Sequence, residues 1–196
     1  MPRLAAAFAL LVAVVLVAGA AHAHQPFFEE RDYTLAAPYR FADPSVSTAV
    51  YARLEPSGDV DYYQFQGRAG QQVPVRIDIP QIRGLEGFAP SVALLGPPEG
   101  AKVPEGVSVP PGVGALVVWG PPAGTPPTFF EPFTRTSYWT RQNQQVTLPA
   151  NGTYYLAVFH PQGQTGKYVL SVGEQEVRGG DPDFRAKLKR YFQPGR

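Results

Sequence analysis

Apolar and polar residues alternate along several short stretches of this chain, most clearly from Gln72 to Ile79. Every second residue from Val73 to Ile79 is valine or isoleucine, and the residues between them are polar apart from Pro74. Strict alternation predicts a β-strand with one buried face and one solvated face. Pro74 has no N–H to donate to a neighbouring strand, so we expect this strand near a sheet edge.

The stretch from Val60 to Gly67 alternates in the same way and places Asp61, Tyr63 and Phe65 on one face. Only a short segment containing Gly70 separates it from the next strand. That spacing is typical of a β-hairpin with a short loop. We therefore expect residues 60–67 and 72–79 to pair as a hairpin.

Six further stretches have the length and composition of strands. They cover residues 46–54, 91–95, 114–119, 144–148, 153–160 and 167–172. A total of about eight strands with no helix between them predicts an all-β fold, an antiparallel jelly-roll-like β-sandwich.

Proline and glycine interrupt the pattern between residues 96 and 143. The chain contains 22 prolines and 20 glycines, and Gly-Pro-Pro or Pro-Pro-Gly sequences recur in this stretch. Prolines stiffen a loop without giving it strand or helix pairing. The sequence predicts a long Pro/Gly-rich region of stiff surface loops.

A short C-terminal helix is predicted over residues 181–192, with Asp181 as its cap and Pro182 at its first position. Phe184, Leu188 and Phe192 recur at steps of four. The opposite face is basic and carries Arg185, Lys187, Lys189 and Arg190. Such a helix can dock on a membrane surface or in a partner groove; folding back on its own domain is the ordinary alternative.

The N-terminus has the pattern of a secretory signal peptide. Arg3 precedes an apolar run, Leu4 to Ala21, that ends in Ala21-His22-Ala23. Cleavage after Ala23 is expected, and a membrane anchor is the alternative. Export predicts a secreted or periplasmic protein.

The chain has no cysteine, which excludes disulfides and a lipid-modified cysteine. An exported domain without disulfides depends on its hydrophobic core. The formal net charge of +1 gives no general reason to expect nucleic acid as a partner. We divide the chain into a signal peptide (1–23), an N-terminal extension (24–44), a sandwich (45–176) and a basic tail helix (177–196).

Four blocks in order resemble the bacterial pre-peptidase C-terminal domain. They are Asp61-Tyr-Tyr-Gln-Phe65 with Ala69-Gly70, Ser91-Val-Ala-Leu-Leu-Gly96, Gly152-Thr-Tyr-Tyr-Leu-Ala-Val158 and Gly166-Lys-Tyr-Val-Leu-Ser-Val172. The resemblance implies a jelly-roll-like sandwich that binds matrix or polysaccharide and performs no catalysis. Two features depart from the family: the loop region 97–142 is longer, and Pro90 and Ser91 stand where an aspartate is usual.

Asp59 and Asp61 are the candidate calcium ligands. Some members of that family hold calcium with aspartates at this strand entry and with acidic residues from the preceding segment. Calcium takes six to eight oxygen ligands, so further carboxylates are needed. Upstream acidic residues that could supply them are Glu29, Glu30, Asp32 and Asp43. The alternative is that Asp59 and Asp61 accept backbone N–H groups at a turn.

Two other candidate sites follow from residue type. His24 would be the first residue after cleavage, where its amine and imidazole can chelate copper; His160, at a strand end, is the one other mature histidine. An aromatic group could form a platform for sugars or a partner, and its members are Phe129, Phe130, Phe133, Tyr138 and Trp139. The alternative is that these rings cover one open end of the sandwich.

No arrangement of residues matches a catalytic motif. The sequence predicts an exported, non-catalytic module that binds an extracytoplasmic glycan, matrix or envelope component and requires no cofactor. One alternative is a structural or assembly subunit of a cell-envelope complex, tethered by the aromatic loop and the basic tail. The other is a copper-binding protein built on His24.

Overall fold

The computed structural model describes residues 24–56 and 58–194. The predicted signal peptide, residues 1–23, lies outside the described residues. Among the described residues, no helix has the length and apolar character needed to cross a membrane.

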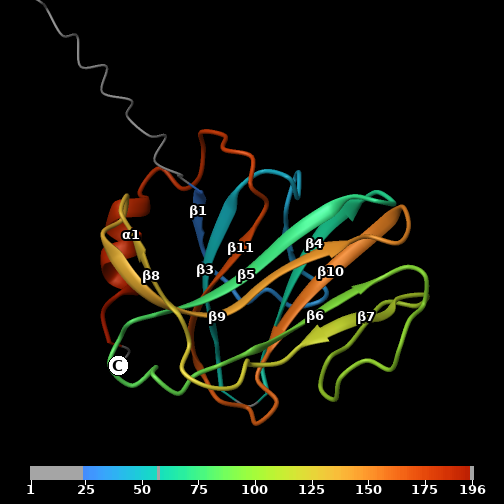
Figure 1. Ribbon diagram of the computed structural model, residues 1–196, viewed down its shortest axis with the longest axis horizontal. Coiled ribbons are helices and arrows are strands. Elements are labelled where there is room, and N and C mark those ends of the chain that lie inside the picture. Colours follow the sequence, from blue (N-terminus) through green and yellow to red (C-terminus); the bar gives the residue numbers. More distant parts are fainter. Residues whose placement is uncertain (1–23, 57, 195–196) are drawn as a thin grey trace, which may run out of the picture.

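The fold is an all-β sandwich of two sheets with one short helix, which confirms the predicted all-β sandwich; the jelly-roll arrangement stays a prediction (Figure 1). The six-stranded sheet has the order β1 (Gln25–Phe28), β3 (Thr48–Leu54), β11 (Gly166–Val172), β5 (Gln72–Pro80), β9 (Thr136–Thr147) and β8 (Thr128–Glu131). The five-stranded sheet has the order β2 (Tyr39–Arg40), β4 (Val60–Gly67), β10 (Gly152–Phe159), β6 (Ser91–Gly96) and β7 (Gly114–Trp119).

The core lies between the two sheets and is built from the alternating positions of the predicted strands. Tyr63, Ile77, Leu156 and Leu170 are fully buried there. Full burial of a large apolar side chain contributes roughly 1.5–3 kcal/mol, so these alternating rows carry much of the stability. The period-two faces expected for residues 60–67, 72–79, 153–160 and 167–172 are confirmed.

The predicted hairpin of residues 60–67 and 72–79 is wrong. β4 pairs with β10 and β2, whereas β5 pairs with β11 and β9 in the other sheet. The turn through Gly70, which has φ +79°, therefore carries the chain across the core. Two alternating strands bury the same residues whether they lie side by side or face each other across a core, so the pattern could not separate the two arrangements.

The edge position expected from Pro74 is also wrong, because β5 lies between β11 and β9. The last residue of β5 that pairs with β11 at this end is Val75, opposite Val172. Pro74 falls one residue beyond it and has only Gln145 of β9 opposite. A proline is tolerated inside this sheet because β11 has already ended at that point.

The region expected to form loops contains a hairpin, β8–β9, and β9 begins at Thr136 rather than at residue 144. Its register against β5 shifts at Arg141, since Ile77 pairs with Gln142 and Asp78 with Thr140. A bulge of this kind resets the alternation, which hid the strand from a period-two pattern. The loop before β7 is not simply a surface loop either: its Val107 packs on the outer face of the five-stranded sheet.

The N-terminal segment contributes a strand to each sheet. β1 pairs in parallel with β3, with Phe27 opposite Val50, and β2 pairs in parallel with β4. These two parallel pairs depart from the expected antiparallel arrangement. They also place residues 29–38 along the entry of β4.

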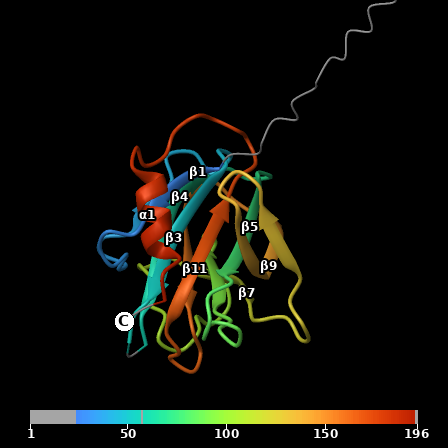
Figure 2. The same ribbon diagram turned by 90° about the vertical axis from the view of Figure 1, so that its left-hand side faces the viewer.

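Helix α1 (Phe184–Tyr191) is shorter than predicted and lies on the outer face of the six-stranded sheet (Figure 2). Leu188 is buried against that face, and the Tyr191 hydroxyl donates to the carbonyl groups of Ala52 and Tyr168. Asp181 does not cap the helix; its carboxylate accepts the N–H of Phe28 on β1. The helix thus folds back on its own domain.

We expect Leu188→Ala to lower the free energy of unfolding by about 2–4 kcal/mol, because it truncates the one buried side chain of the helix. Lys189→Ala, on the exposed side of the same helix, is the matched control and should change it by less than about 0.5 kcal/mol. Urea unfolding of the chain from His24 to Arg196 measures both. Equal effects of the two substitutions would contradict the docked helix.

Candidate functional site

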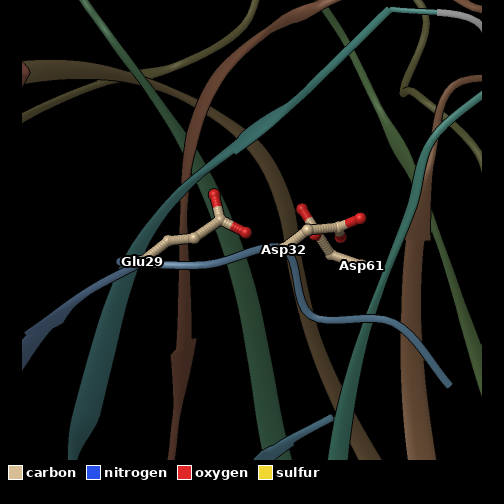
Figure 3. A group of neighbouring side chains, drawn as sticks. All are labelled: Glu29, Asp32 and Asp61. Atoms are coloured by element: carbon tan, nitrogen blue, oxygen red, sulfur yellow. The ribbon is translucent and has the colours of Figure 1, made fainter. Parts of the chain in front are cut away.

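Three carboxyl groups meet where the N-terminal segment crosses the entry of β4 (Figure 3). Glu29 follows β1, Asp32 lies in the next turn, and Asp61 is the second residue of β4. One oxygen atom from each lies within 4.8 Å of the others. We call these three residues the acidic cluster.

Asp61 occupies an inward position of β4 and is completely buried. The Tyr168 hydroxyl donates to its Oδ2 atom at 2.5 Å, and the Tyr63 and Tyr168 hydroxyls lie 2.7 Å apart. The other carboxylate oxygen, Oδ1, is buried and has no hydrogen-bond partner among the described residues. A buried carboxyl oxygen without a partner is costly, so Oδ1 needs either a proton shared with the neighbouring Glu29 carboxylate or a bound cation.

The other members of the cluster are held more loosely. Glu29 is partly buried and accepts the N–H of Arg53 at 2.9 Å, whereas Asp32 is exposed. No basic side chain forms an ion pair with either residue or with Asp61 among the residues that the structure describes. The cluster is therefore a concentration of acidic groups without a cationic partner.

Asp59, the other predicted ligand, is not part of the cluster. Its carboxylate accepts the N–H of Glu55 at 2.7 Å and closes the turn between β3 and β4, as the alternative interpretation expected. Two of the upstream candidates also lie elsewhere: Asp43 accepts the N–H of Ser45, and Glu30 pairs with Lys187. Sequence reasoning named Glu29 and Asp32 as suppliers of further ligands, but no signal in the spacing distinguished them from these two.

The acidic cluster holds protons more tightly than separate carboxyl groups do. Burial, and then the charge of Glu29, raise the pKa of Asp61 far above its usual range. Burial also raises the pKa of Glu29, an effect that the Arg53 N–H partly offsets. Burial and the charge of Asp59 raise the pKa of Asp32. Desolvation and like charges both disfavour the ionised forms.

The predicted aromatic group is divided by the β8–β9 hairpin. Tyr138 is buried, Trp139 packs against the core, and Phe129 lies under the guanidinium of Arg76, which is 4.1 Å from its ring centroid. Only Phe130 and Phe133 remain largely exposed, at 57% and 44%. The rings therefore do not form one platform.

Phe133 instead combines with the C-terminal helix. Its ring stacks on Phe184, with centroids 5.5 Å apart and an interplanar angle of 15°. Between the β8–β9 turn and α1 runs a groove of about 510 Å³. Aromatic and basic side chains line this groove: Phe133, Arg135, Phe184, Arg185, Lys189 and Phe192. We call this surface the aromatic–basic groove. In the sequence its two walls belong to separate features, the aromatic group and the C-terminal helix.

His24 and His160 lie near opposite ends of β3. His24 Nδ1 is hydrogen-bonded to the Ser47 hydroxyl, next to the first residue of that strand. His160 stacks on Phe88, and Gly163 in the turn after it lies against Gly58, beyond the last residue of the strand. A seven-residue strand spans roughly 20 Å, so His160 is too far away to join His24 in a copper site.

No protein-family model and no curated protein matches the chain. Similar solved structures include PliG of Aeromonas hydrophila, a periplasmic inhibitor of g-type lysozyme, with 18% identity, a TM-score of 0.42 and coverage of 78% of this chain and 100% of that one. The PliG of Salmonella Typhimurium, also a periplasmic inhibitor of g-type lysozyme, has 18% identity and a TM-score of 0.35. The similarity covers 76% of this chain and 97% of that one.

The pre-peptidase C-terminal domain of a collagenase from Bacillus anthracis is also similar, with 16% identity, a TM-score of 0.37 and coverage of 74% of this chain and 99% of that one. A domain of the family that the four sequence blocks resemble is thus among the similar structures. Likeness at this identity concerns the fold and carries no argument about function.

The raised pKa values of Asp61 and Glu29 predict an unusual dependence of stability on pH. In the presence of chelator, the folded state binds more protons than the unfolded state above the ordinary carboxyl pKa of about 4. The free energy of unfolding should therefore fall as the pH rises from about 5 to about 8.

Asp61→Asn keeps the acceptor for Tyr168 and removes the titration of Asp61, so it should reduce this decline and leave the part due to Glu29, whereas Asp59→Asn should preserve most of it. Denaturant unfolding at several pH values measures the slopes. The same decline in Asp61→Asn and in the parent chain would show that other groups, such as the buried Asp78, cause it.

Proposed function

We propose that this chain is an exported, non-catalytic module that binds a glycan, matrix or envelope component outside the cytoplasm. The observation that carries the proposal is the aromatic–basic groove. It joins one exposed phenylalanine ring, Phe133, and the partly buried rings of Phe184 and Phe192 to cationic side chains beside the outer face of the six-stranded sheet. Exposed aromatic and arginine side chains around a concavity are typical of recognition surfaces.

Export is supported by the signal-peptide pattern of the N-terminus. The alternative of an assembly subunit in an envelope complex uses the same surface, because the aromatic loop and the basic helix lie against each other. Deleting the tail is a poor test of either function, since it would expose the apolar residues that Leu188 covers. Point substitutions in the groove avoid this difficulty.

We expect the chain from His24 to Arg196 to co-sediment with at least one of three insoluble materials: peptidoglycan sacculi, fibrillar collagen or cellulose. Phe133→Ser should reduce the bound fraction severalfold, because it removes an exposed ring from the groove. Val118→Ser, an equally exposed apolar position on β7, is the matched control. Absence of binding to all three materials, or equal loss in both variants, would contradict this proposal.

We also propose that the acidic cluster binds a divalent cation, with calcium as the best fit. The unpartnered Oδ1 of Asp61 favours this proposal, and three carboxyl groups are the hard oxygen donors that calcium takes. Glu29, Asp32 and Asp61 would hold the ion, in place of the Asp59–Asp61 pair expected from the sequence. The ion would neutralise the cluster and fasten the N-terminal segment to β4.

Calcium at millimolar concentration should raise the melting temperature of the parent chain, since a ligand of the folded state stabilises it. The shift should grow from about pH 6 to about pH 8, because calcium displaces protons from the cluster. Asp61→Asn should abolish the shift, and Asp43→Asn, at a carboxylate outside the cluster, should keep it. A shift that survives in Asp61→Asn would place the ion elsewhere.

A further inference from the structure

The charges that line the aromatic–basic groove are unbalanced. Arg135, Arg185 and Lys189 all line it, and none of them forms an ion pair with a described residue. Lys187, on the same helix, is paired with Glu30 and Asp181. Carboxylates thus pair with Lys187, whereas the basic side chains that line the groove have no acidic partner among the described residues.

The backbone at Arg135 gives a second, independent observation. Arg135 has φ +56° and is the one non-glycine residue with positive φ in the described part of the chain. This left-handed conformation is unfavourable for a residue with a Cβ atom, and glycine adopts it without cost. Strain of this kind is concentrated at functional positions. An arginine at such a position of the groove points to a use for its side chain.

The shape of the groove argues against a membrane surface as its occupant. An amphipathic helix binds a bilayer by inserting its apolar face, but here that face is turned to the sheet and Leu188 is buried. The stacking of Phe133 on Phe184 also occupies one face of each ring, so among the proposed classes of ligand the groove favours a protein component over a glycan. An open concavity of about 510 Å³ with apolar walls and a cationic rim fits an apolar side chain flanked by carboxylates.

We propose that the occupant of the groove is an acidic segment of an extracytoplasmic protein, with an aromatic or large aliphatic side chain inserted between the β8–β9 turn and α1. This inference rests on the binding function proposed above and specifies its partner. The apolar side chain contacts Phe133, Phe184 and Phe192, and the flanking carboxylates pair with Arg135, Arg185 and Lys189. Association is then salt-dependent, because the charge pairs lie at an exposed rim.

The test uses two synthetic peptides, acetyl-Glu-Asp-Phe-Asp-Glu-amide and its uncharged counterpart acetyl-Gln-Asn-Phe-Asn-Gln-amide, titrated into the chain from His24 to Arg196. We expect the acidic peptide to bind about tenfold more tightly, and this difference to shrink as salt is raised. Equal binding of the two peptides, or binding of neither, would overturn the inference.

Two variants and one control separate recognition from folding. Arg135→Gly relieves the left-handed backbone, so it should keep or raise the melting temperature. It should also weaken the binding of the acidic peptide about threefold. Lys189→Gln should weaken the binding of the acidic peptide to a similar degree. Arg190→Gln removes the same charge from an exposed position outside the groove and should change nothing. Unchanged binding in both groove variants would overturn the inference.

Two further measurements distinguish this inference from its rivals. Vesicles containing anionic lipid should not retain the chain, and retention that Arg135→Gly and Lys189→Gln abolish would overturn the inference in favour of a membrane. In the co-sedimentation assay, a loss of binding in Phe133→Ser but not in the charge variants would overturn the acidic partner and leave the proposed function standing. A loss of co-sedimentation in all three variants supports both the proposed function and the acidic partner.

Discussion

The hydroxyl group of Tyr168 joins the two sheets inside the core of the sandwich. Tyr168 belongs to β11 of the six-stranded sheet, and its hydroxyl contacts Tyr63 and Asp61, both on β4 of the five-stranded sheet. All three side chains are fully buried. Because a buried polar group without a partner is costly, these three groups hold β4 and β11 at one separation and one register. These contacts of the Tyr168 hydroxyl fix the position of Asp61, and with it the position of the acidic cluster at the entry of β4.

The N-terminal segment connects that bridge to the helix on the outside of the molecule. Three consecutive residues do so: the N–H of Phe28 binds Asp181, Glu29 enters the acidic cluster, and Glu30 pairs with Lys187. Lys167 on β11 completes the attachment by donating to the carbonyl groups of Tyr191 and Gln193 at the end of the helix. The acidic cluster and the aromatic–basic groove are therefore linked through one short stretch of backbone.

Local patterns predicted the strands whose side chains alternate without interruption. β4 and β7 have the expected bounds, β5, β6 and β11 differ from expectation by one residue at one end, and β10 is shifted by one residue at both ends. β9 was recognised only in its last part, because the bulge at Arg141 shifts the alternation and because two polar residues, Arg141 and Gln142, are buried there. β1 and β2 are too short to show a period at all. For the site, the alternation placed Asp61 on the same face as Tyr63 and Phe65, but nothing local indicated that Glu29 and Asp32 rather than Glu30 and Asp43 would meet it.

The sequence by itself determined the all-β class, the inward rows of the core strands and the amphipathic character of the C-terminal helix, because each follows from side-chain spacing within one element. The tertiary structure decided how those elements combine: that β4 and β5 lie in different sheets, that the helix covers the six-stranded sheet, and that Phe133 meets Phe184. These outcomes depend on contacts between residues far apart in the chain. Spacing along one strand or helix records which face is apolar, and the surface that covers that face is set only when the whole chain packs.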